Sequence, residues 1–135
     1  MTSIETINKI FTMKSIAVVG MSPKPERPSH YVALYLKENG YDIIPVNPGH
    51  SEIAGLTSYP SLLDIPSKVD IVDVFRRSEH VMSIVEDTIK IKAKALWLQD
   101  GVINEDAESI AKVKKLLFVM NDCMLRKHRQ FKHNV

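Results

Sequence analysis

Short apolar runs alternate along this chain with stretches in which hydrophobic residues recur every three or four positions. Apolar runs of about 4–8 residues are typical of strands that are buried on both faces of a parallel sheet. On this basis we predict five strands: Ile16–Gly20, Asp42–Val46, Ile71–Phe75, Ala95–Leu98 and Leu116–Met120.

The N-terminal stretch predicts a short helix over about 3–12. Its residues Thr2-Ser3-Ile4-Glu5 have the spacing of a capping box, in which two side chains satisfy the first free backbone amides of a helix. The apolar residues of this stretch recur at helical spacing and are predicted to face inward: Ile4, Ile7, Ile10 and Phe11.

Further helices are predicted over about 29–39, 78–91 and 104–115, followed by a helical tail that starts at Cys123 and then frays. Ser78 and Asn104 are suitable N-caps, because their side chains can accept hydrogen bonds from free backbone amides. Asn39-Gly40 is a suitable helix end, because glycine tolerates the left-handed conformation of a C-cap.

Strands that are apolar on both faces and alternate with helices imply a parallel sheet covered on two sides. We therefore predict that residues 1–135 form a single α/β domain, a three-layer Rossmann-like fold with a five-stranded parallel sheet and helices on both faces. Ligands of such sheets bind outside the carboxyl ends of the strands. The segments expected to meet there are 20–29, 47–50, 76–77 and 99–102.

Composition narrows the classes of function. The 18 basic and 16 acidic residues give a net charge of only +2, which does not indicate a nucleic-acid or membrane partner. No apolar run approaches the roughly 20 residues that span a bilayer. The one cysteine, Cys123, excludes an internal disulfide and favours a reducing cytoplasm as the location.

The loop after the first predicted strand has the features of a phosphate-binding loop. Gly20 lets the chain approach a ligand closely, and the backbone amides of Met21 and Ser22 can donate to a phosphate. The hydroxyls of Ser22 and Ser29 are further donors, although Ser29 alone is also explained as a plain N-cap. The loop departs from the dinucleotide fingerprint, because Ser22 stands where that motif has its second glycine and no third glycine follows.

Cationic residues lie in two of the predicted loops. Arg27 and Lys24 are either phosphate partners or solvated surface residues. Arg76-Arg77 directly follows the third strand, and because consecutive residues of an extended segment point apart, we expect only one of the pair to face the ligand. The alternative for this pair is a surface position with an ion pair to Asp73 or Glu79.

The end of the second strand bears on which nucleotide binds. Rossmann units that bind NAD usually place an acidic residue there, on the ribose hydroxyls. This chain has the neutral pair Asn47-Pro48, which does not repel a ribose phosphate. Asn47 is either a ligand contact or a turn residue before Pro48. NAD is therefore disfavoured, whereas NADP stays open because Arg76 or Arg77 can serve its 2′-phosphate.

Five motifs occur in order along the chain: Gly20-Met21-Ser22-Pro23 with Arg27-Pro28-Ser29, Ile44-Pro45-Val46-Asn47-Pro48, Tyr59-Pro60-Ser61-Leu62, Asp70-Ile71-Val72-Asp73-Val74-Phe75-Arg76-Arg77, and Trp97-Leu98-Gln99-Asp100-Gly101-Val102. Together they resemble the small bacterial and archaeal CoA-binding proteins, stand-alone relatives of the CoA-binding domain of succinyl-CoA synthetase and of ADP-forming acyl-CoA synthetases. The resemblance covers about residues 10–130. It implies that coenzyme A lies along the strand ends, with Gln99, Gly101 and Val102 against its adenine or pantetheine part.

The function implied by this resemblance is binding of CoA or an acyl-CoA, with no intrinsic catalytic activity as the favoured expectation. The alternatives are a small NADP-dependent oxidoreductase or one component of a split acyl-CoA ligase. A second copy of the chain or an acyl-CoA-using protein is a possible partner. We predict no catalytic residue and no metal site, because the five histidines lack metal-ligand spacing with cysteine. Cys123 is interpreted as a small buried residue, with a mixed disulfide to the ligand thiol as the alternative.

Overall fold

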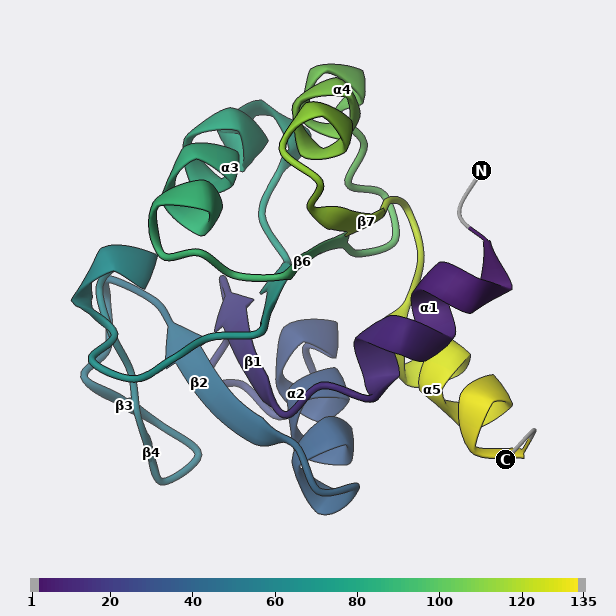
Figure 1. Ribbon diagram of the computed structural model, residues 1–135. Helices are drawn as coiled ribbons and strands as arrows, with labels where there is room; N and C mark the ends of the chain where they lie inside the picture. The colour runs from purple at the N-terminus through teal and green to yellow at the C-terminus, as the bar shows by residue number, and fades with distance from the viewer. Residues whose placement is uncertain (1–2, 134–135) are drawn as a thin grey trace.

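The centre of the molecule is a five-stranded parallel sheet in the order β2-β1-β5-β6-β7 (Figure 1). The computed structural model describes residues 3–133. The strands of the sheet are β1 (Ser15–Val19), β2 (Asp42–Val46), β5 (Ile71–Val74), β6 (Ala95–Leu98) and β7 (Leu117–Val119). All of the predicted strands are confirmed, β2 and β6 with the predicted bounds and the others to within one residue at each end.

Helices cover both faces of this sheet, as predicted. The helices α1 (Ile4–Phe11), α2 (Pro28–Glu38) and α5 (Met124–His133) cover one face, and α3 (Val81–Lys90) and α4 (Glu105–Val113) cover the other (Figure 1). Alternate strand residues enter two separate hydrophobic clusters. Val18 and Trp97 pack toward the first group of helices, whereas Ala17 and Leu96 pack toward the second. The three-layer Rossmann-like prediction is therefore confirmed.

The helix α1 begins one residue later than the capping-box pattern predicts. Its N-cap is Ser3, whose Oγ accepts a hydrogen bond from the backbone amide of Thr6 at 3.1 Å. Ile7, Ile10 and Phe11 are buried as predicted, but Ile4 is 71% exposed, so that part of the prediction is wrong. The first turn of α1 projects away from the sheet, which leaves Ile4 in solvent (Figure 1). Thr2, the predicted cap, lies outside the described residues.

The predicted N-cap of α3 is also wrong, whereas that of α4 is confirmed. Ser78 starts a short 3-10 turn, η2 (Ser78–His80), and its hydroxyl accepts from the backbone amide of Ile103 at 2.9 Å instead of capping a long helix. Asn104 caps α4, since its Oδ1 accepts from the backbone amide of Ala107 at 2.9 Å. Gly40, with a φ of 97°, follows the C-cap of α2 as expected.

A small antiparallel hairpin is the main element that the sequence did not reveal. It consists of β3 (Glu52–Ile53) and β4 (Leu56–Thr57), joined by a turn at Ala54-Gly55 in which both residues have positive φ. Strands of two residues are too short to show an alternating pattern. A 3-10 turn, η1 (Leu62–Asp64), follows the hairpin.

The C-terminal tail forms α5, which confirms the predicted helix. The predicted fraying is not seen within the described residues, since α5 continues through His133. Among residues 3–133, no helix has both the length and the apolar character needed to cross a membrane.

Candidate ligand-binding site

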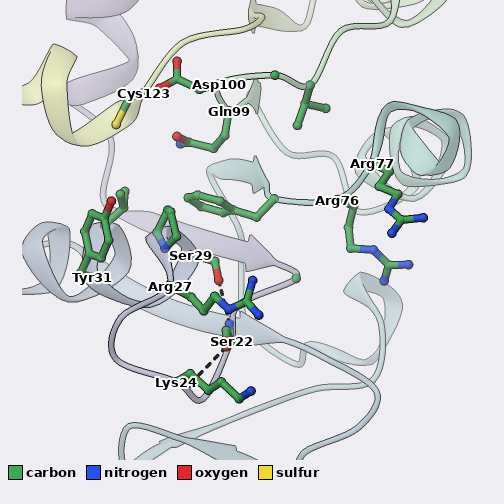
Figure 2. A pocket seen from close by; sticks show the side chains of 16 residues that line it. Ser22, Lys24, Arg27, Ser29, Tyr31, Arg76, Arg77, Gln99, Asp100 and Cys123 are labelled. Atoms are coloured by element: carbon green, nitrogen blue, oxygen red, sulfur yellow. Dashed lines mark hydrogen bonds between the residues drawn. The ribbon is translucent and has the colours of Figure 1, made fainter.

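A cavity of about 640 Å³ opens at the carboxyl edge of the sheet. It is bounded by the loop after β1, the first turn of α2, the residues that follow β5 and β6, and Cys123 before α5 (Figure 2). The predicted site residues that line it are Gly20, Ser22, Arg27, Ser29, Arg76, Arg77, Gln99, Gly101 and Val102. Three of the four predicted loops therefore meet at one place, because the strands that precede them are parallel neighbours.

Met21, Asn47 and Pro48 are not among the residues that line this cavity. Met21 is fully buried, and its carbonyl oxygen accepts a hydrogen bond from Asn47 Nδ2 at 2.9 Å. Asn47 Oδ1 accepts from the backbone amide of Gly49 at 2.8 Å. These two bonds give Asn47 the turn role that the sequence left open, and they join the loops after β1 and β2. Pro48 lines a second, smaller hollow of about 180 Å³.

The loop after β1 is held in shape by its own serines. The backbone amide of Ser22 donates to Ser29 Oγ at 2.9 Å, so this amide already has an acceptor. Ser22 Oγ in turn accepts from the backbone amide of Lys24 at 3.1 Å. His30 Nδ1 lies 2.8 Å from the carbonyl oxygen of Ser22. Because each serine oxygen accepts one bond, each hydroxyl proton is left to donate to a ligand.

Gly20 is required for a reason that the sequence did not suggest. Its φ is 87°, and a Cβ at this position would lie 3.0 Å from the carbonyl oxygen of Phe75 and 3.0 Å from Arg76 Cδ. Contacts of this length are tighter than nine in ten of those made by real Cβ atoms, so the neighbouring atoms would have to move by a few tenths of an ångström. The absence of a side chain at Gly20 therefore makes room for the stem of Arg76, which borders the cavity.

Cationic side chains give one part of the cavity a positive character. Lys24 and Arg27 come from the loop after β1, and Arg76 and Arg77 follow β5 (Figure 2). Both arginines line the cavity, and the prediction that only one of them faces the ligand stays a prediction. The backbone bends at Arg76, so the alternation of an extended strand does not continue past β5. Arg77 lies 3.9 Å from Glu79, but both side chains are largely exposed and this contact adds little stability.

Asp73 does not pair with either arginine. It lies on β5 with no exposed surface, and its Oδ1 accepts a hydrogen bond from Gln99 Nε2 at 2.6 Å. Burial raises the pKa of Asp73 to about 8, and the bond from Gln99 opposes that rise. Gln99 directly follows β6 and is 4% exposed. Asp73 and Gln99 are therefore a buried, hydrogen-bonded polar pair at the edge of the cavity.

The far side of the cavity, next to α5, is formed by Asp100 and Cys123 (Figure 2). Cys123 is only partly buried, although it packs against the hydrophobic cluster on the α1 side of the sheet, so its interpretation as a buried residue is correct only in part. Its backbone amide donates to Asp122 Oδ1 at 2.9 Å. Arg126 on α5 bonds to both Asp100 and Asp122, and these bonds raise its pKa. This network ties the start of α5 to the loop after β6.

Comparison with known proteins decides the family. A family model described as a CoA binding domain matches residues 14–129. The chain belongs to the CoA binding domain family. The uncharacterized protein YneT of Bacillus subtilis is 41% identical over 115 residues, which cover 85% of each chain. A solved structure of a hypothetical protein from Pyrococcus horikoshii OT3 is 44% identical, with a TM-score of 0.92 over 96% of this chain and 92% of that one.

This CoA binding domain also resembles part of a larger enzyme. The ADP-forming acetate–CoA ligase II of Archaeoglobus fulgidus is 30% identical over 115 residues, which cover 84% of this chain but only 17% of the ligase. The ligase therefore contains far more protein than the segment that matches this domain.

Lys24, Pro28 and Asp100 also line the cavity of this CoA binding domain and lie within the predicted segments. The lining residues outside those segments are Tyr31, Val32, Phe75 and Cys123. Phe75 and Cys123 follow strands at their carboxyl ends, so the rule that selected the other loops also points to them. Tyr31 and Val32 follow Ser29 in the first two turns of α2. No sequence pattern distinguishes them from residues of an ordinary helix.

Proposed function

We propose that this protein binds coenzyme A or an acyl-CoA in the cavity at the carboxyl ends of the strands. The observation that carries the proposal is the group of four cations, Lys24, Arg27, Arg76 and Arg77, on a cavity of a CoA binding domain. Coenzyme A carries a pyrophosphate and a ribose 3′-phosphate, and cationic side chains bind such groups with charge-assisted hydrogen bonds.

The pyrophosphate is assigned to the loop after β1. The hydroxyl protons of Ser22 and Ser29 are available there, and the backbone amide of Ser29 lies in the first turn of α2, where the helix leaves amides free. A helix N-terminus also favours a negative charge. Arg27 belongs to the same loop, whereas Arg76 and Arg77 follow β5 and are assigned to the 3′-phosphate (Figure 2).

The proposed role is binding without catalysis, as a CoA-binding or regulatory protein. The polar groups near the loop after β1 are engaged in holding the structure. His30 Nδ1 bonds to the Ser22 carbonyl oxygen, and Asp73 bonds to Gln99, so these residues do not form a nucleophile–base pair with Ser22. A second candidate role, as one component of a split acyl-CoA ligase, is favoured by the similarity to a segment of an ADP-forming acetate–CoA ligase.

Calorimetric titration of the protein with CoA, dephospho-CoA, NADP and NAD tests the proposal. We expect CoA to bind with micromolar affinity, dephospho-CoA to bind more weakly, and NAD not to bind. Equal binding of CoA and dephospho-CoA would contradict the assignment of a cationic side chain to the 3′-phosphate. Tighter binding of NADP than of CoA would replace the proposal with the oxidoreductase alternative. The ligase role requires acyl-CoA formation from acid, CoA and ATP when a partner subunit is added, and no formation by this chain alone.

A further inference from the structure

Asp73 is a carboxyl group on β5, the central strand of the sheet, whose other residues are all apolar. It lies between Val18 of β1 and Trp97 of β6, in register with both, and has no exposed surface. Its Oδ1 accepts from Gln99 Nε2, but its Oδ2 has no hydrogen-bond partner among residues 3–133. Buried polar atoms are nearly always hydrogen-bonded, so a carboxyl group kept at this position calls for an explanation.

The bond between these two side chains fixes the orientation of an amide at the cavity. A glutamine amide has an acceptor end and a donor end, and in solvent it can turn to offer either. Here Nε2 of Gln99 is committed to Asp73 at 2.6 Å, which leaves Oε1 as the end that is free to accept. Gln99 lines the cavity, so a ligand there meets an acceptor that is already oriented.

We propose that Asp73 is a positioning residue, which holds the Gln99 amide so that its Oε1 accepts a hydrogen bond from an amide N–H of the pantetheine arm. This inference rests on the proposed CoA site and names the part of the ligand that is recognised there. The position of Gln99 in the cavity favours a contact with the pantetheine arm and not with the phosphates. It lies with Asp100 and Cys123, on the side away from Ser22 and Lys24 (Figure 2).

The pantetheine arm has the chemistry that this side of the cavity requires. It carries two amide N–H groups and no charge, whereas the cations that line the cavity come from the loops after β1 and β5 and not from the side of Gln99. The amino group of adenine is the other N–H donor in CoA. The experiment therefore includes one analogue for each source: CoA with ester oxygens in place of the two amide N–H groups, and CoA with hypoxanthine in place of adenine.

The test is calorimetric titration of three proteins with CoA, both analogues and dephospho-CoA. The wild type is expected to bind the ester analogue about tenfold more weakly than CoA, the effect of one hydrogen bond lost from a partly dry site. Asp73→Asn is the matched control, because its Oδ1 can accept the same bond from Gln99, and it should keep this discrimination. Asp73→Val removes the acceptor, so its affinity for CoA should fall about tenfold and its discrimination against the ester analogue should disappear.

Separate outcomes identify what has failed. A wild type that does not bind CoA contradicts the proposed function. A wild type that binds CoA and the ester analogue equally, or an Asp73→Val protein that still discriminates, overturns the role of Asp73. If the hypoxanthine analogue binds more weakly than CoA and the ester analogue does not, Gln99 contacts adenine, and the assignment to the pantetheine arm is overturned. If Asp73→Val does not fold, Gln99→Met, which lacks both amide groups, must show the same loss of discrimination. The ratio of CoA to dephospho-CoA affinity should stay unchanged in every folded variant.

Discussion

Gly20 and Gly101 both border the cavity with a positive φ, of 87° and 82°, but their surroundings differ. A Cβ added at Gly20 would contact the backbone of Phe75 and the side chain of Arg76, whereas a Cβ at Gly101 would meet open space. Both substitutions carry backbone strain, but only the one at Gly20 also displaces an arginine of the proposed ligand site.

Gly20→Ala is therefore expected to be the more disruptive of the two. We expect Gly101→Ala to lower the free energy of unfolding by about 1 kcal/mol and Gly20→Ala to lower it by about 3 kcal/mol, because the second adds a steric clash to the strain. Urea denaturation of both variants measures the difference. Equal losses at the two positions would contradict the packing of Arg76 against Gly20.

Ser22 tests the assignment of the pyrophosphate. Ser22→Asp keeps an oxygen that can accept from the Lys24 amide, so the loop should hold its shape, but it places a negative charge among the proposed phosphate donors. We expect the affinity for CoA to fall at least about tenfold, since like charges disfavour binding. Ser22→Asn is the neutral control and should lose much less. Unchanged CoA affinity in Ser22→Asp, measured by titration, would show that the pyrophosphate binds elsewhere on the protein.

At the scale of the elements, buried strands were predictable and helix starts were less so. The strand β6 has the predicted bounds because its four consecutive apolar residues are typical of a strand with both faces buried, and all four are buried. The predicted start of α3 was wrong. Serine is a suitable residue type for an N-cap, but the Ser78 hydroxyl accepts a hydrogen bond from the backbone amide of Ile103, 25 positions later. Such a long-range hydrogen bond leaves no local pattern in the sequence. Asn104 was predicted correctly because its partner, the Ala107 amide, is local.

The cap of α4 gives a direct test at this scale. Asn104→Ala removes the side-chain oxygen that accepts from the Ala107 amide and is expected to lower the free energy of unfolding by about 1 kcal/mol. Asn104→Asp retains an acceptor and places a negative charge at the helix N-terminus, so it should be close to the wild type. Thermal and urea denaturation measure both variants. A loss of the same size in Asn104→Asp would show that the cap does not stabilise α4.

At the scale of the whole molecule, the rule for parallel sheets predicted where the cavity lies but not every side chain in it. Gln99 and Arg76 follow strands at the carboxyl edge and line the cavity, as expected. Asn47 also follows a strand at that edge, but its side chain turns to the carbonyl oxygen of Met21. The direction of such a side chain depends on contacts between loops that are distant in sequence, which no spacing rule describes.

The buried carboxyl of Asp73 makes the stability of the whole domain depend on pH. Its pKa is raised by burial to about 8, above the value of about 4 in the unfolded chain, so the folded state retains a proton that the unfolded state loses. The stability contributed by the protonated form is complete below about pH 4 and is lost as pH rises from about 4 to about 8, with a slope of at most about 1.4 kcal/mol per pH unit.

Asp73→Asn removes this titration and keeps the hydrogen bond to Gln99. Relative to the wild type, its free energy of unfolding should therefore increase steadily between about pH 5 and pH 8 and then level off. Urea denaturation across this range measures the difference between the two proteins. A difference that stays constant with pH would show that Asp73 has no raised pKa in the folded state.

The central claim is that coenzyme A occupies the cavity between the loop after β1, the arginines after β5 and the loop after β6. A crystal structure of the protein with CoA tests this claim most directly. We expect the pyrophosphate within hydrogen-bonding distance of the Ser22 and Ser29 hydroxyls, and the pantetheine arm beside Gln99. A CoA molecule bound outside this cavity, or bound with its pyrophosphate away from the loop after β1, would contradict the account.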